Sequence, residues 1–127
     1  MFAQVPKLPP PLQRIATTPV LASERPAGFP HVKITRLAAN RHVHTLGAVR
    51  IDFSNSRSSE SASYALMRTH AAALRLARRE ATVQTGGLFH IRAVASGRFA
   101  VGVTATTKAK AKILLALALA HLRRSER

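Results

Sequence analysis

The chain has 127 residues, which suits one domain with tails, and 46% hydrophobic residues with only 5% aromatic ones predict a core of aliphatic side chains and alanine. Cysteine is absent, which excludes a disulfide framework and a thiolate metal site, and 5 acidic residues leave little material for acid–base catalysis. The 20 lysines and arginines give a formal net charge of +15, so we expect a polyanion as partner, and nucleic acid is favoured over a membrane because no apolar stretch is long enough to span a bilayer.

Residues 1–30 contain all seven prolines and one acidic residue, Glu24. Proline fixes the backbone φ angle and lacks an amide donor, so this composition predicts an extended basic tail without a core of its own. Such a tail can lie over a partner or over its own domain, or bind an aromatic groove as a proline-rich ligand. Organelle-targeting segments are also acid-poor, but the prolines disfavour their amphipathic helix, so a mitochondrial and a cytoplasmic location both stay open.

Two stretches of alternating apolar and polar residues in 31–53 predict an additional β-hairpin with its turn near 38–41. His42 and His44 are two positions apart, which would place both rings on one face of a strand. That spacing suits a metal pair, but no cysteine or carboxylate stands nearby, and we expect no metal. Together with Arg41, the two rings form either a basic edge for nucleic acid or a polar strand face.

A helix is predicted to follow, from an N-cap at Ser58 or Ser59 to about Glu80, with Glu60 favourably placed in its first turn. Its buried stripe would consist of alanines, leucines and a methionine: Ala62, Leu66, Met67, Ala73, Leu74 and Ala77. The other face would carry arginines: Arg68, Arg75 and Arg79, with Arg78 beside them. An arginine stripe is either a solvated face or a phosphate contact. Residues 81–84 would then form the first strand of a three-stranded sheet.

The last part of the chain predicts a second hairpin and a second helix. Phe89–Ala95 and Arg98–Thr104 alternate as half-buried strands, with a tight turn at Ser96-Gly97. Thr106 or Thr107 would cap the helix. Its buried positions recur at helical spacing: Ala111, Leu114, Leu115, Ala118 and Leu122.

Three lysines, Lys108, Lys110 and Lys112, crowd the first turn and a half of this helix. Cations there are disfavoured by the positive end of the helix dipole, which suggests an anion in front of the helix. The other interpretation is a solvated face of an amphipathic helix.

This order of elements resembles the C-terminal half of the double-stranded RNA-binding domain, in which strand, turn and strand precede a helix opened by the pattern Ser-Lys-Lys-x-Ala-Lys. The matching positions are Phe89, Gly97, Thr107, Lys108, Ala111 and Lys112, while Ala109 replaces the second lysine and Lys110 stands beside it. The Gly-Pro-x-His loop of that family is absent, and only Thr85-Gly86-Gly87 stands near its place. The resemblance implies that the lysines straddle a major groove and that the arginines of the preceding helix face the neighbouring minor groove.

We therefore expect an α+β fold in residues 31–127, with a small antiparallel sheet, two helices packed on one face in a core of residues 58–124, and the hairpin 31–53 before it. The expected function is non-catalytic RNA binding within a large ribonucleoprotein such as a ribosome, beside neighbouring proteins and without a cofactor. The expected RNA contacts are Lys108, Lys110, Lys112, Arg68, Arg75, Arg78, Arg79 and Arg41. An alternative is an assembly protein whose leucine-rich helix, Ile113–Leu122, packs on a copy of itself or on a partner. No nucleophile–base pair or phosphate-binding glycine loop indicates an enzyme.

Overall fold

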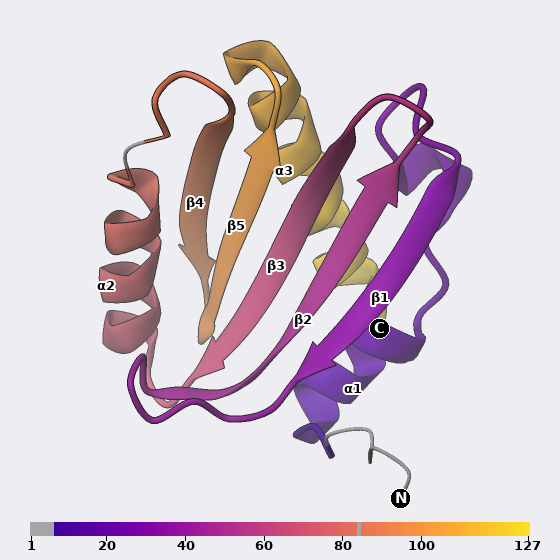
Figure 1. The fold of residues 1–127 in the computed structure, drawn as a ribbon. Helices are drawn as coiled ribbons and strands as arrows, with labels where there is room; N and C mark the ends of the chain where they lie inside the picture. The colour runs from indigo at the N-terminus through magenta and orange to yellow at the C-terminus, as the bar shows by residue number, and fades with distance from the viewer. Residues whose placement is uncertain (1–6, 84) are drawn as a thin grey trace, which may run out of the picture.

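The computed structural model describes residues 7–83 and 85–127, and within them five strands form one antiparallel sheet in the order β1-β2-β3-β5-β4 (Figure 1). The strands are β1 (His31–Leu37), β2 (Thr45–Ser54), β3 (Ser59–Met67), β4 (His90–Ser96) and β5 (Phe99–Ala105). The helices are α1 (Pro10–Thr17), α2 (His70–Ala81) and α3 (Lys108–Ser125), with a short 3₁₀ turn η1 (Ala22–Glu24). The α+β class, the antiparallel sheet and the two predicted hairpins are confirmed.

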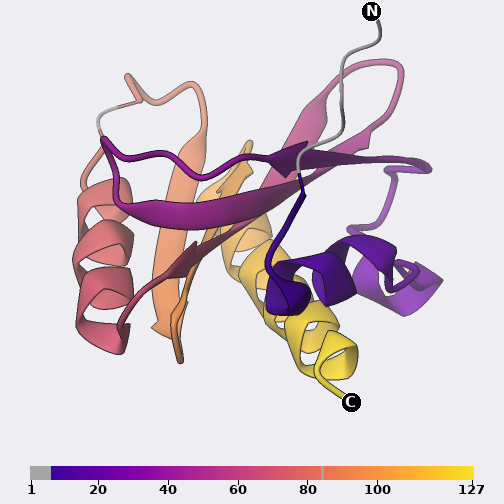
Figure 2. The ribbon, with the colours of Figure 1, turned by 90° about the horizontal axis from the view of Figure 1, so that it is seen from below.

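The prediction of two helices on one face of the sheet is wrong, because α2 and α3 lie on opposite sides of β4 and β5 (Figure 2). Strand β5 explains this arrangement. Its residues Phe99, Val101 and Val103 belong to the core under α3, whereas Ala100 packs on the other side with Ala73 of α2. Small residues on that second side let a helix approach closely, so both faces of β5 are buried.

The predicted helix start at Ser58 or Ser59 is also wrong, because residues 59–67 form β3 at the centre of the sheet, between β2 and β5. Glu60 is therefore not in a first helical turn but is buried in a strand. Helix α2 begins later, where the hydroxyl of Thr69 accepts a hydrogen bond from the amide of Ala72 at 3.1 Å. It ends at Ala81, so the strand predicted for 81–84 is not found at 81–83, and residue 84 lies outside the described residues.

Within residues 7–30, the prediction of an extended tail without a core is wrong, and residues 1–6 lie outside the described residues. Pro10 and Pro11 begin α1, where the missing amide donors of proline cost nothing because the first turn leaves those donors unpaired. Leu12 and Ile15 on this helix are fully buried, and the helix contacts β1, β2 and α3. The first segment therefore completes the core on the α3 side of the sheet.

The apolar surface of α3 is explained by this packing. Its residues Leu114, Leu115 and Leu122 are buried in the main core, and Leu119 packs against the same core. Because α3 contacts the sheet and also α1 and η1, which lie beside it on the same side of the sheet, the helix needs more than one apolar face. Among the large apolar side chains of α3 in the described structure, only Ile113 is exposed, at 58%.

Candidate nucleic-acid interface

The loop between β1 and β2, residues 38–44, reaches to α2 (Figure 1). Asn40 pairs with Thr45 at the base of this loop, and the Asn40 side chain accepts a hydrogen bond from the amide of His42 at 2.9 Å. His44 has a left-handed backbone, with φ of 58°. His42 and His44 therefore lie in a turn, and the prediction that both rings share a strand face is wrong.

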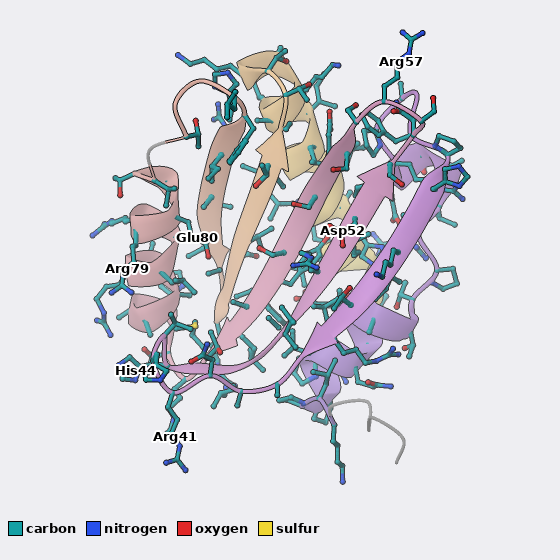
Figure 3. The ribbon with its side chains drawn as sticks, in the orientation of Figure 1. Arg41, His44, Asp52, Arg57, Arg79 and Glu80 are labelled. Atoms are coloured by element: carbon teal, nitrogen blue, oxygen red, sulfur yellow. The ribbon has the colours of Figure 1, made fainter. Side chains whose placement is uncertain are left out.

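This loop and α2 enclose a hollow of about 80 Å³, which we call the arginine pocket. Its polar lining is His44, Arg75 and Arg79, and Val43 and Leu76 contribute apolar surface. Arg75 and Arg79 are one helical turn apart, so their side chains leave α2 on the same face. Figure 3 shows Arg79 directed away from the sheet and His44 at the end of the loop nearest α2. The fold thus brings together one histidine and two arginines that are about thirty residues apart in sequence.

Neither Arg75 nor Arg79 forms an ion pair within the described part of the protein. The ion pairs found there are Arg50 with Asp52, and Glu24 with both His121 and Arg124. Arg75 and Arg79 therefore repel each other across a small hollow without a carboxylate to compensate. Planar guanidinium groups in such a position bind phosphate or carboxylate oxygens well, because each can donate two parallel hydrogen bonds.

A larger hollow of about 740 Å³, which we call the sheet groove, adjoins the arginine pocket. Its floor is the sheet surface beside α2, with Ala48, Ser63 and the largely buried Ala65, which also packs with Ala73 of α2. One wall is α2 with Leu76 and Glu80, and the other is the β1–β2 loop, with Asn40, Arg41 and His42. Val43 and Leu76 line both hollows, so the groove and the pocket share one wall.

Glu80 is the one carboxylate in the lining of the sheet groove. It continues the buried stripe of Ala73 and Ala77 along α2, which directs it toward the sheet (Figure 3). Its carboxylate occupies the space above Gly102 where any larger residue would place a Cβ atom, and Ser63 Oγ borders the same space. Burial raises the pKa of Glu80, and no hydrogen bond or ion pair to this carboxylate is found among the described residues.

The three lysines lie elsewhere. Lys108, Lys110 and Lys112 are exposed on the first turns of α3, on the opposite face of the sheet from α2, and Thr107 caps the helix as predicted. Glu60 is buried close to them, at 2% exposure, and neither of its carboxylate oxygens has a hydrogen-bond partner in the described structure. Burial raises the pKa of Glu60, and the charge of Lys110 reduces that rise.

The predicted contact residues are thus divided by the fold. Arg75 and Arg79 meet in the arginine pocket, and Arg41 lines the adjoining groove. Arg78 is exposed on α2 outside both hollows, and Arg68 precedes α2 rather than belonging to its stripe. The family resemblance implied that the lysines and the arginines face neighbouring grooves of one RNA. In the structure they lie on opposite faces of the sheet and do not form one continuous surface.

Two lining residues were not predicted to be functional, Glu80 and Ser63. One feature of the sequence indicates that Glu80 faces the sheet, because it falls on the alanine stripe of α2 and not among the arginines. Ser63 was not predicted because the sequence pattern placed it in a helix rather than in β3.

A search of family models, curated proteins and solved structures finds no match to this chain. The described residues contain no cluster of metal-ligating side chains and no helix that could span a membrane.

Proposed function

We propose that this protein is a non-catalytic RNA-binding protein that contacts the phosphate backbone and is held, with neighbouring proteins, in a large ribonucleoprotein. The observation that carries the proposal is the distribution of its few acidic residues. Glu24 and Glu60 are buried, Asp52 is paired with Arg50, and Glu80 is half-buried in the sheet groove. Only Glu126 is an exposed acid in the described structure.

The exposed charged groups are therefore almost all positive. A formal charge of +15 that is not neutralised internally favours a polyanion, because binding releases the counterions that the polyanion holds. Two separate basic regions support RNA over a compact anion. The arginine pocket lies on one side of the sheet and the lysines of α3 on the other. A folded RNA that surrounds the protein offers phosphates to both sides, whereas a single short duplex does not.

In this proposal the arginine pocket is the principal phosphate contact. Arg75 and Arg79 donate to phosphate oxygens, and His44 adds a third donor from the loop. Arg41 and the lysines hold further phosphates without reading sequence, because backbone contacts position a protein and carry no base information.

Fluorescence anisotropy with a labelled RNA hairpin tests the proposal. The variant Arg75→Ala with Arg79→Ala is compared with Arg57→Ala with Arg123→Ala, which removes the same formal charge from exposed positions outside the pocket. Figure 3 shows Arg57 far from Arg79. We expect the pocket variant to bind about tenfold more weakly or worse, since hydrogen bonds to charged groups contribute about 1.5–3 kcal/mol each. Equal losses of affinity in both variants would mean that the pocket arginines contribute no more to binding than other exposed arginines do. No measurable binding by the wild-type protein would reject RNA as the partner.

A further inference from the structure

The arginine pocket and the sheet groove differ in chemistry although they share Val43 and Leu76. The pocket is small and cationic. The groove is larger, has an apolar floor of Ala48 and Ala65, and holds one carboxylate. The parts of a nucleotide complement these two hollows. Its phosphate is anionic, and its sugar joins the phosphate to a flat base whose edge carries hydrogen-bond donors.

We propose that the two hollows form a single subsite for one unpaired nucleotide, with its phosphate in the arginine pocket and a guanine base in the sheet groove against Glu80. This inference rests on the proposed RNA-binding function and adds a base-reading position to it. Recognition of RNA sequence generally uses unpaired bases, because the edges of paired bases in an RNA duplex are hard to reach.

The floor of the groove suits a flat ring. Ala48 and Ala65 are paired neighbours on β2 and β3, and their side chains are short, so a base can lie close to the sheet. Leu76 stands at the side of this floor. The groove volume of about 740 Å³ leaves room for a base and its ribose together.

The position of Glu80 selects the base. A carboxylate presents two acceptor oxygens and no donor, and guanine is the base that offers two adjacent donors on one edge, N1–H and the 2-amino group. Uracil offers one N–H between two carbonyl oxygens, and these oxygens are repelled by a carboxylate. Because the Glu80 carboxylate is half-buried without a partner in the described structure, it gains more from such a donor pair than a solvated carboxylate would.

Gly102 leaves free the space that the Glu80 carboxylate occupies. An alanine there would put a methyl group where the carboxylate now lies, and the flexible end of the Glu80 side chain would have to move. Gly102→Ala therefore displaces the carboxylate without changing the charge of the protein. It forms a second test that is independent of Glu80→Gln.

The experiment measures the affinity of the full chain for labelled RNA octamers of uridine that carry guanosine, inosine or uridine at one central position. Inosine keeps N1–H and lacks the 2-amino group. We expect the guanosine octamer to bind at least about fivefold more tightly than the uridine octamer, as good paired hydrogen bonds to a base edge allow, with inosine between them. Glu80→Gln and Gly102→Ala should each abolish the preference for guanosine over uridine.

The matched control is Glu126→Gln, which removes the same charge from an exposed position and should keep the preference. Equal affinities for the guanosine and uridine octamers overturn the inference, as does a preference that survives in Glu80→Gln. If no octamer binds, the proposed RNA-binding function fails separately. Titration with free guanosine and inosine monophosphates then decides the subsite: a Glu80-dependent preference for guanosine monophosphate assigns it to a free nucleotide, and no preference overturns it.

Discussion

Nδ1 of His121 lies 2.9 Å from Oε1 of Glu24, a residue 97 positions earlier in the chain. Arg124 donates to the same carboxylate, with Nε 2.6 Å from Oε2, and the backbone amide of Leu21 donates to Oε1 at 3.1 Å. Nε2 of His121 faces the carbonyl oxygen of Ile15 at 3.2 Å. These contacts join η1 and α1 to the end of α3, so the segment that contains α1 and η1 is part of the domain.

The Glu24 network predicts a loss of stability in acid. The hydrogen bond from Arg124, with that from His121, lowers the pKa of Glu24 from 4.5 to about 2 in the folded protein. Because the folded-state value lies below the unfolded one, the carboxylate stabilises the fold above pH 4.5, and this contribution disappears as the pH falls toward 2. We expect the free energy of unfolding to fall by up to about 3 kcal/mol over that interval, measured by urea denaturation.

Glu24→Gln is the control for this prediction. The variant should be less stable than the wild type at pH 6, and the difference between them should shrink at pH 2.5, where the wild-type carboxylate is largely protonated in the unfolded state. A difference that stays constant from pH 6 to pH 2.5 would contradict the assigned role of Glu24.

The buried Glu60 predicts a pH dependence of stability with the opposite sign. Its carboxylate is buried without a hydrogen-bond partner in the described structure, and burial raises its pKa, so ionisation disfavours the fold as the pH rises above 4.5. Glu60→Met should therefore stabilise the protein at pH 7 by about 1–3 kcal/mol, because an unpaired buried polar group is removed. The gain should decrease at pH 3.5, and a variant less stable than the wild type at pH 7 would refute the assignment.

Helix α1 gives a third prediction. Leu12 is fully buried where α1 meets β2, and its Cδ1 lies close to the backbone of Gly47. Leu12→Ala should lower the free energy of unfolding by about 2–5 kcal/mol, as for other buried leucines. Gln13→Ala, on the exposed side of the same helix, should change it by less than about 0.5 kcal/mol. Equal effects of the two changes would mean that α1 does not dock.

The lysines of α3 should act independently of the arginine pocket, because the sheet separates them. We expect Lys108→Glu with Lys112→Glu to weaken RNA binding, and its effect to add to that of Arg75→Ala with Arg79→Ala within about 0.5 kcal/mol. Arg14→Glu with Arg57→Glu makes the same change in charge at other exposed positions and serves as the control. Strong coupling between the lysine and arginine variants would indicate one shared RNA contact.

Local patterns predicted the elements whose signal lies within a few residues. The alternation in β1, β2, β4 and β5 and the cap of α3 at Thr107 are such signals, and these elements are confirmed. Strand β3 was missed because Ser58-Ser59-Glu60 has the composition of a helix start. Yet Ser59, Ser61 and Ser63 alternate with inward residues, and the pairing with β2 and β5 decides in favour of a strand.

The composition of the first thirty residues was also misleading, because prolines at the beginning of a helix are compatible with it and Leu12 and Ile15 supply its buried face. The candidate site could be predicted only in part. The arginine spacing on α2 indicated a cationic face, but the meeting of His44 with Arg75, and of Glu80 with Gly102, depends on contacts between distant parts of the chain. No local pattern contains such contacts.

The salt dependence of RNA binding tests the central claim most directly. The affinity of the wild-type protein for a structured RNA is measured by anisotropy from 50 to 300 mM KCl, concentrations chosen to span roughly the range over which phosphate contacts weaken. We predict a straight line of log affinity against log salt with a negative slope of about 0.7–0.9 for each phosphate contacted, and a slope smaller by about one to two units in Arg75→Ala with Arg79→Ala. An affinity that does not change with salt would contradict phosphate binding as the function of this surface.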